Sequence, residues 1–247
     1  MLRITLNPLL ICLLLISSAA DAGTLSTPGT LRWVTVAKVF DGDTFRTASG
    51  EKIRLLGINT PEIGHDHQVA QPYGKEAKRR LISLIAGKSV QLRLDKELRD
   101  KYGRTLAQVF LRNGAWINRQ LVAEGLAHVY TFMPNSYWAA PLLEAEKRAR
   151  NRKAGIWKTE LFRILDANGL APHHIGQFHL VRGFVKSIQP WRFQLGKLQV
   201  SVAQNDRQWF HQAQLPRAGE KVIVRGKIRT SVTGQLQLSL HSPFDLE

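Results

Sequence analysis

The amino-acid sequence predicts a mainly β protein with added helices, of the α+β class, in which two small β-barrels follow one another. Short segments of alternating apolar and polar residues, separated by tight turns, begin at Trp33 and recur in the last third of the chain. Segments with apolar residues at helical spacing are interleaved with the strands of the first half. A chain of 247 residues is long enough for two such units with separate cores.

The first unit is expected over residues 31–160. Its clearest helix is predicted over 73–86, because apolar residues recur there at helical spacing and Gly87 follows as a stop signal. Three short strands are predicted within 33–58 and two more at 90–94 and 106–111, and further helices are predicted over 115–126 and 141–154. Strands and helices interleaved in this way suggest a small barrel with helices packed against it.

The second unit is expected over residues 177–247. The preceding segment, 161–176, is predicted to be a linker because it contains turn-forming residues such as Gly169. Beyond it the alternation returns in several short segments, which predicts an all-β unit. The tripeptide Val-Arg-Gly occurs at 181–183 and again at 224–226, and we interpret the two copies as two strands of one barrel.

Residues 1–22 are predicted to be a secretory signal peptide. Arg3 precedes an apolar run over 9–16, and small residues then lead to an Ala-x-Ala cleavage pattern that ends at Ala22. The alternative is a membrane anchor, but the run is well short of the roughly 20 apolar residues that a spanning helix needs. We therefore expect an exported protein, periplasmic or secreted, with no stable membrane insertion after cleavage. The only cysteine, Cys12, lies in this segment, so the mature chain needs no disulfide.

The chain is strongly basic. It has 35 Lys and Arg residues against 19 Asp and Glu residues, which gives a formal net charge of +16. This charge favours a polyanion such as nucleic acid as the partner, because lysines and arginines placed near phosphates release bound counterions. Solubility, or loose attraction to an anionic cell envelope, is the alternative explanation.

Polar residues gather at three turns of the first unit. The turns are D-G-D-T at 41–44, Arg54 with N-T-P-E at 59–62, and D-K-Y-G-R at 100–104. Hydrolysis of a phosphodiester needs a hard cation or its equivalent beside the phosphate, a group that activates water, and donors for the charge that develops on phosphorus. These turns supply candidates for all three. Their carboxylate and carbonyl oxygens suit Ca²⁺ or Mg²⁺, whereas no Cys/His spacing suits zinc.

The three motifs, in this order, make residues 33–157 resemble the staphylococcal nuclease (thermonuclease) family. The later segments E-G-L-A at 124–127 and A-G-I-W at 154–157 belong to the same resemblance. The resemblance implies an OB-type five-stranded barrel with three helices. It also implies a calcium-dependent nuclease that hydrolyses phosphodiester bonds of DNA and/or RNA to 3′-phosphate products. The second unit is expected to be a smaller OB-like β-barrel.

The resemblance assigns roles to residues at all three turns. It implies Arg54, Glu62 and Arg104 as catalytic residues, Asp43, Asn59 and Thr60 as metal ligands, Asp41 as a support of the metal site, and Lys101 and Tyr102 as substrate-binding residues. Thr60 would contribute its backbone carbonyl, and Glu62 would hold or deprotonate the attacking water. The two arginines would grip the phosphate, because a planar guanidinium matches two phosphate oxygens better than an ammonium does. The implied cofactor is Ca²⁺.

Asn59 departs from the family pattern, which usually has aspartate there as the second carboxylate on the metal. An amide oxygen still binds Ca²⁺, but one negative charge is lost, so we expect weaker metal binding. One alternative is a catalytically weak or inactive nucleic-acid-binding protein on a nuclease scaffold, and another is an envelope adaptor whose second barrel binds protein. The segment is also good turn chemistry in itself. Turn chemistry does not account for Arg54, Glu62 and Arg104.

Aromatic residues supply further candidates for contact with bases. Tyr130, Phe132 and Tyr137 fall where a base could stack on the rim of the first barrel, and Trp191 or Trp209 could do so in the second. Packing in a core, or contact with another protein, is the alternative for each. The sequence identifies no protein partner for the second unit.

Overall fold

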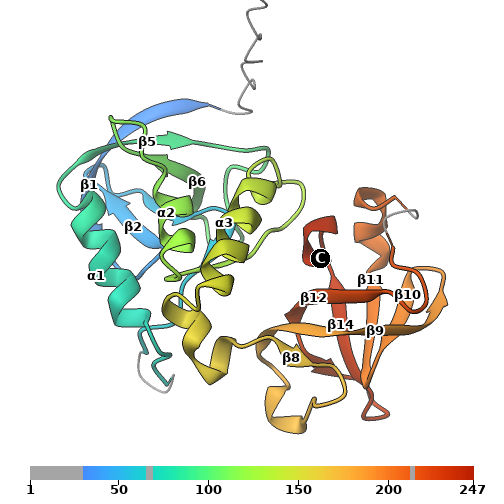
Figure 1. Ribbon diagram of the computed structural model, residues 1–247. Helices are drawn as coiled ribbons and strands as arrows, with labels where there is room; N and C mark the ends of the chain where they lie inside the picture. The colour runs from blue at the N-terminus through green and yellow to red at the C-terminus, as the bar shows by residue number, and fades with distance from the viewer. Residues whose placement is uncertain (1–29, 65–68, 212–214) are drawn as a thin grey trace, which may run out of the picture.

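A closed barrel of five strands forms the first unit (Figure 1). The structure, a computed structural model, describes residues 30–64, 69–211 and 215–247. The barrel strands are β1 (Leu31–Val39), β2 (Thr44–Thr47), β3 (Lys52–Leu55), β5 (Ser89–Arg93) and β6 (Thr105–Phe110). They follow the order β1-β2-β3-β6-β5, in which β3 and β6 are parallel and the other neighbours are antiparallel. The predicted class and the predicted five-stranded barrel are therefore confirmed.

Three α-helices of the described chain accompany this barrel (Figure 1). They are α1 (Gly74–Ile85), α2 (Ile117–Ala123) and α3 (Ala139–Asn151). The first helix forms where apolar residues recur, and Ala77, Leu81 and Ile85 on its inner face are buried. Gly87 follows with a positive φ of 68°. The three predicted helices are confirmed, although α2 is shorter than its predicted range of 115–126.

A pair of two-residue strands lies beside the barrel, and one of its side chains packs against the second unit. β4 (Ile58–Asn59) pairs with β7 (His128–Val129) so that Asn59 lies opposite His128. The ring of His128 stacks on Phe178 of the second unit, with centroids 4.3 Å apart. Strands of two residues have no periodicity, so no pattern in the sequence predicts this pair.

Two glycines allow the end of α2 to touch the chain that follows α3. Gly125 has a φ of +71°, and Gly155 opens the 3-10 helix η1 (Gly155–Lys158) with a φ of +53°. The N–H of Ile156 donates to the carbonyl oxygen of Gly125 at 2.8 Å. A Cβ at either glycine would overlap the backbone of the other segment. The E-G-L-A and A-G-I-W segments therefore meet in one contact.

The second unit is a β-sheet whose strand order repeats that of the first barrel (Figure 1). Its elements are β8 (Leu165–Asp166), β9 (Phe178–Gln189), β10 (Arg192–Leu195), β11 (Leu198–Val202), β12 (Lys221–Lys227), β13 (Arg229–Thr230) and β14 (Leu236–Leu240), with 3-10 helices η2 (Glu160–Phe162), η3 (Pro172–His174), η4 (Gln204–Trp209) and η6 (Pro243–Asp245). The run β12-β9-β10-β11-β14 has the same pairing directions as β5-β1-β2-β3-β6, with the parallel pair last. Because β12 also contacts β14, the two ends of this run approach each other, as in an OB-like unit.

Two further sequence predictions concern this second unit. The Val-Arg-Gly segments lie in β9 and β12, which pair with Val181 opposite Val224. They are two strands of one sheet, as we interpreted them.

The predicted linker, 161–176, contains β8, which pairs with β9, and its Leu170 is buried in the second core. Part of that segment therefore packs on the second unit, while the domain limits themselves stay predictions.

The predicted signal peptide, residues 1–22, lies outside the described residues, and its cleavage stays a prediction. Within the part of the chain that the structure describes, no helix is both long enough and apolar enough to cross a membrane.

A buried ion-pair network joins the two units. Glu146 of α3 has no solvent exposure, and its Oε2 accepts a hydrogen bond from Arg225 of β12 at 2.8 Å. Its Oε1 accepts the backbone N–H of Val129 in β7 at 2.7 Å. Arg225 is 2% exposed and also pairs with Glu247. Removal of Glu146 would leave the buried Arg225 with Glu247 as its remaining partner, and loss of one partner from a buried ion pair destabilises a protein strongly.

The variant Glu146→Gln should lower the free energy of unfolding by roughly 3 kcal/mol, because Arg225 would remain charged and buried. The matched control is Glu144→Gln on the same helix, which removes only an exposed pair with Arg148 and should change stability by less than about 1 kcal/mol. Urea unfolding measures both values. Equal losses would contradict a special role for the buried network.

His179 of β9 should make the protein acid-sensitive. Its ring is 4% exposed, and neither ring nitrogen has a hydrogen-bond partner among the described residues. Burial, followed by the nearby His174 and His173, lowers its pKa from 6.5 to about 4. The unfolded chain therefore takes up the proton first, so stability is complete above about pH 6.5 and falls by up to about 3 kcal/mol toward pH 4.

The variant His179→Leu should flatten this part of the pH dependence, because the leucine cannot titrate. Urea unfolding of both proteins between pH 7.5 and pH 4.5 measures the difference. An unchanged slope in the variant would assign the acid sensitivity to other groups.

Candidate active site

The turn between β1 and β2 places two carboxylates side by side. Asp43 is buried, and its backbone N–H donates to Oδ1 of Asp41 at 3.0 Å. Burial, and then the charge of the Asp43 carboxylate, raise the pKa of Asp41 to about 6. The turn therefore concentrates negative charge in a place where a cation would be stabilised.

The carboxylate of Asp43 ties the three strands of this corner together. Its Oδ2 accepts hydrogen bonds from the backbone N–H of Thr60 at 2.8 Å and from the Thr60 hydroxyl at 3.0 Å. The same oxygen lies 3.0 Å from a terminal nitrogen of Arg54. Asp43 thus fixes the turn after β4 against the turn after β1.

Arg54 of β3 lies between the acidic turn and Asn59. One terminal nitrogen of its guanidinium contacts Asp43 and donates to the Leu55 carbonyl at 3.0 Å, and the other donates to Oδ1 of Asn59 at 2.8 Å. The Nδ2 of Asn59 donates in turn to the Thr60 carbonyl at 3.3 Å. Because its side chain is only 12% exposed, Arg54 is held in one orientation by these partners.

The residues at this corner fit a hard cation. Carboxylates from Asp41 and Asp43, the amide oxygen of Asn59 and the carbonyl of Thr60 are all oxygen donors, which Ca²⁺ and Mg²⁺ prefer. The described ranges contain no cluster of three or more His, Cys, Asp or Glu side chains that could hold a metal. A metal here would therefore depend on two neutral oxygens beside two carboxylates. Such a site should bind a cation more weakly than one with a carboxylate in place of Asn59.

A second rigid turn carries Arg104. Asp100 accepts the backbone N–H groups of Tyr102 and Arg104 with Oδ1, and its Oδ2 accepts Nε–H of Arg104 at 2.7 Å. Burial acts to raise the pKa of Asp100, but the hydrogen bonds from Arg104 and the backbone outweigh it and hold the pKa below its ordinary value. Lys101 and Arg104 both lie over the Tyr102 ring, at 5.1 and 5.4 Å from its centroid.

One cleft of about 680 Å³ brings the two corners together. Of the residues with predicted roles, its lining includes Arg54, Asn59, Lys101, Tyr102 and Arg104. Asp41, Asp43 and Thr60 are not in its lining. Asp43 pairs with Arg54, Thr60 accepts a hydrogen bond from Asn59, and Asp41 is linked to them through the backbone N–H of Asp43. The aromatic rim candidates Tyr130 and Phe132 line the cleft as well, whereas Tyr137 does not.

Glu62 is also absent from the lining of this cleft, and among the described residues no hydrogen bond or ion pair ties its side chain to the residues that do line it. It is exposed, its backbone N–H donates to Oε1 of Gln71 at 3.0 Å, and its carbonyl accepts the N–H of Gln71 at 2.9 Å. These bonds fix the backbone and leave the carboxylate in solvent. Its role as a base stays a prediction.

Two residues that support the site had no predicted role. Asp100 orients Arg104, and an aspartate at the start of the D-K-Y-G-R turn was an available signal, because its carboxylate accepts backbone N–H groups within such a turn. Asn135 holds the loop beside the cleft by two hydrogen bonds of 2.8 Å to the backbone of Glu97. The partners are 38 residues apart, so no local pattern could have indicated this contact.

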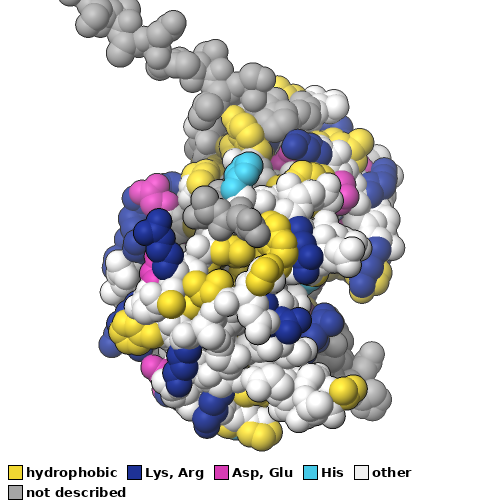
Figure 2. Space-filling view, turned by 90° about the vertical axis from the view of Figure 1, so that its right-hand side faces the viewer, with side chains coloured by type: hydrophobic (Ala, Val, Ile, Leu, Met, Phe, Trp, Pro, Cys, Tyr) yellow, Lys and Arg dark blue, Asp and Glu magenta, His cyan; other side chains and the backbone are white. Residues whose placement is uncertain are grey.

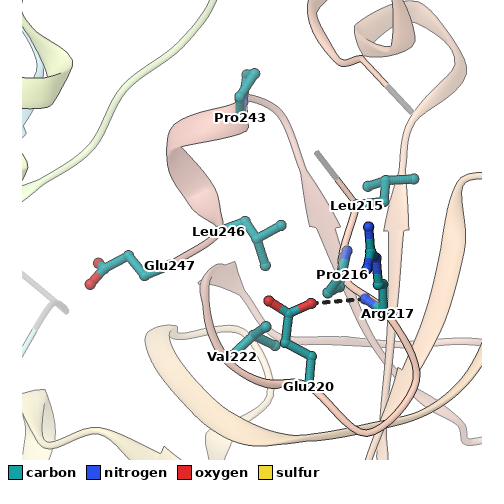
Figure 3. Close-up of a pocket in the computed structure, with 8 residues that line it drawn as sticks. All are labelled: Leu215, Pro216, Arg217, Glu220, Val222, Pro243, Leu246 and Glu247. Atoms are coloured by element: carbon teal, nitrogen blue, oxygen red, sulfur yellow. Dashed lines mark hydrogen bonds between the residues drawn. The ribbon is translucent and has the colours of Figure 1, made fainter. Parts of the chain in front are cut away.

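A larger hollow, of about 770 Å³, lies on the second unit but lacks this chemistry (Figure 3). The backbone N–H of Arg217 donates to Glu220 there at 2.9 Å, and Figure 3 shows the side chain of Glu247 turned away from the other lining residues. None of the residues with predicted roles lines it. The cleft of the first unit is therefore the candidate active site.

The barrel, its three helices and the polar turns at one cleft define a protein of the OB-type barrel class. Residues 52–159 match the family model described as staphylococcal nuclease homologue. The thermonuclease of Staphylococcus intermedius is 36% identical over 126 residues, which cover 50% of this chain and 74% of that protein. The chain belongs to the staphylococcal nuclease homologue family.

Other relatives agree with this assignment. The thermonuclease of Staphylococcus hyicus is 36% identical over 125 residues, covering 49% of this chain and 73% of that protein. Endonuclease YncB of Bacillus subtilis (strain 168) is 37% identical over 129 residues, covering 50% of this chain and 61% of that protein. The matched family model ends before the second unit begins.

Gly42 should tolerate no side chain, because a Cβ there would lie 2.7 Å from both the Ala77 Cβ and the Thr60 Oγ1. We expect Gly42→Ala to lower the free energy of unfolding by about 1–3 kcal/mol through overpacking. Gly169→Ala is the control, since its nearest contact would be an ordinary 3.5 Å. Urea unfolding compares the two. A stable Gly42→Ala variant would show that α1 does not press on the acidic turn.

Proposed function

We propose that this protein is an exported, calcium-dependent nuclease that hydrolyses phosphodiester bonds of DNA and/or RNA to 3′-phosphate products. The observation that carries the proposal is the position of Arg54 and Arg104 in one cleft, each held by a buried or half-buried carboxylate. The relatives named thermonuclease and endonuclease support the reaction class. Basic side chains are spread over the face drawn in Figure 2, with acidic ones scattered among them, and the net charge of +16 suits a polyanionic substrate.

The two arginines would bind the scissile phosphate. Their guanidinium groups donate paired hydrogen bonds to phosphate oxygens and stabilise the extra negative charge of the five-coordinate transition state. Because Asp43 and Asp100 already fix their orientation, little reorganisation is needed when the substrate arrives. Lys101 and Tyr102, beside Arg104, would lie along the neighbouring nucleotide.

Asp43, Asn59 and Thr60, supported by Asp41, would hold Ca²⁺. When bound, the cation supplies positive charge beside the phosphate and makes a nearby water more acidic. Glu62 would accept the proton of the attacking water. The new bond joins the water oxygen to phosphorus and the bond from phosphorus to the 5′-oxygen breaks. The departing 5′-oxygen takes up a proton from solvent to become a hydroxyl, so the phosphate stays on the 3′-side.

A second candidate is a nucleic-acid-binding protein with weak or no turnover. It is favoured by two observations, namely the neutral Asn59 in place of a carboxylate and the position of Glu62 outside the cleft lining. Export through the predicted signal peptide, to the periplasm or the medium, is part of the proposal for either candidate. A protein partner of the second unit is not identified.

The deciding measurement is digestion of denatured DNA and of RNA by residues 23–247, with Ca²⁺ titrated from micromolar to millimolar concentrations. We expect calcium-stimulated cleavage in the wild type, and Asn59→Asp should reach half-maximal activity at about tenfold lower calcium because a second carboxylate binds the cation more tightly. Glu62→Gln should lower kcat at least about 100-fold, as expected for loss of a general base. Glu76→Gln, an exposed glutamate of α1, is the control.

The outcomes separate the two candidates. Cleavage by Asn59→Asp but not by the wild type would favour the binding protein. Absence of cleavage in both, at every calcium concentration, would overturn the proposed nuclease. A calcium-dependent rise of the melting temperature, larger in Asn59→Asp, measures metal binding independently of activity.

A further inference from the structure

The candidate active-site cleft continues toward the second unit. Tyr130 and Phe132 line the cleft and also line a neighbouring cavity of about 260 Å³. The opposite side of that cavity is formed by Lys227 of β12, Arg229 of β13 and His241, the residue that follows β14. The two hollows therefore share an aromatic border, with one unit of the protein on each side.

The aromatic border is exposed in a way that suits stacking. Phe132 is 47% exposed and Tyr130 is 37% exposed, and their rings meet edge to face at 4.6 Å. The ring of His241 lies 6.3 Å from that of Phe132, and Phe178 supports Tyr130 from behind at 5.4 Å. Exposed rings on a rigid support are the surfaces on which the bases of single strands stack.

Two cations of this cavity have no ion-pair partner among the residues that the structure describes. Lys227 and Arg229 are exposed, and neither forms an ion pair with another described residue at the distances of a salt bridge. The other basic groups of the cavity are engaged, since Arg225 pairs with Glu146 and Glu247 and His241 pairs with Asp206. Free cations at the mouth of a cavity are available to an anionic ligand.

The cavity holds one acidic side chain, Asp245. Its Oδ2 accepts the backbone N–H groups of His241 and Ser242, and burial raises its pKa to about 6. This carboxylate is therefore committed to closing the turn at η6. The cavity lining therefore has two cations without an ion-pair partner among the described residues and one carboxylate, which leaves an excess of positive charge.

Charge links the two hollows as well as shape. Burial and Asp245 raise the pKa of Tyr130, while Arg54 in the cleft and Arg229 in the cavity act to lower it. One hydroxyl therefore lies within electrostatic range of an arginine from each unit. Tyr130 lies at the border that the cleft and the cavity share.

We propose that Lys227 and Arg229 of the second unit, with the rings of Phe132 and His241, form a secondary binding site for single-stranded nucleic acid at the border between the two units. A strand held at Arg54 and Arg104 would cross the aromatic border, and its neighbouring phosphates would contact the two free cations. The inference rests on the proposed function, because it extends the path of the same substrate. A duplex suits the border less well, since paired bases are not free to stack on single exposed rings.

The site makes the second unit a determinant of substrate length. A strand of about 3 nucleotides is shorter than the range bound by OB-type modules, whereas one of about 12 nucleotides lies within that range and would extend from the cleft to the cavity. Each lost phosphate contact to a single strand reduces the slope of log K against log salt by about 0.7. Loss of both cations should therefore reduce it by about 1.4 for the long strand only.

The test uses residues 23–247 with the double substitution Lys227→Ala/Arg229→Ala. Binding of labelled single strands of 3 and 12 nucleotides is measured by fluorescence anisotropy in EDTA, where calcium-dependent cleavage is absent. We expect the Kd of the 12-mer to rise about tenfold and that of the 3-mer to stay within twofold. The control is Lys186→Ala/Arg192→Ala, which removes the same charge from exposed positions of β9 and β10 outside the cavity.

The outcomes distinguish this inference from the proposed function. Unchanged binding of the 12-mer, an equal loss in the control, or an equal loss for the 3-mer would overturn the secondary site. If the Lys227→Ala/Arg229→Ala variant binds the 12-mer as tightly as the wild type and the protein still cleaves, the secondary site is wrong and the proposed nuclease stands. If the wild type never cleaves but the double variant binds the 12-mer more weakly and the 3-mer equally well, the secondary site stands and the proposed nuclease is wrong. Circular dichroism of the variants confirms that they fold.

Discussion

The buried carboxylate of Glu146 is the constraint on which the arrangement of the two units depends. It binds the backbone of β7 with one oxygen and Arg225 of the second unit with the other. Since β7 pairs with β4, this single side chain fixes the strand that carries Asn59 as well as the sheet behind it. The second unit therefore acts as a support for one corner of the candidate site, in addition to any contact it makes with a substrate.

Few charged side chains set the net charge of the corner formed by the turns after β1 and β4. Asp41 and Asp43 are both acidic, Asn59 is neutral, and Arg54 reaches Asp43 and Asn59 together. Arg54 therefore already compensates part of the negative charge that a metal would otherwise meet. A carboxylate in place of Asn59 would leave more negative charge for a cation, and this is the physical sense in which the amide weakens the site.

Much of the fold and of the cleft could be predicted from the sequence, because the signals were local. Alternation and helical spacing gave the strands and α1, and the turn motifs gave Arg54, Asn59 and Arg104, which do share a cleft. The remaining contacts join residues far apart in the chain. Arg225 and Glu146 are separated by 79 positions, and nothing in either neighbourhood indicates its partner. Glu62 was adjacent in sequence to the site but does not line it.

The contact between Gly125 and Gly155 has a consequence for the evolution of this chain. Each glycine excludes a side chain because of the other segment's backbone, so a larger residue at one position cannot be accommodated by shrinking the residue at the other. Compensation would require a shift of α2 or of the segment after α3. No substitution at one position can therefore compensate for a substitution at the other. We expect both positions to vary only among the codons for glycine.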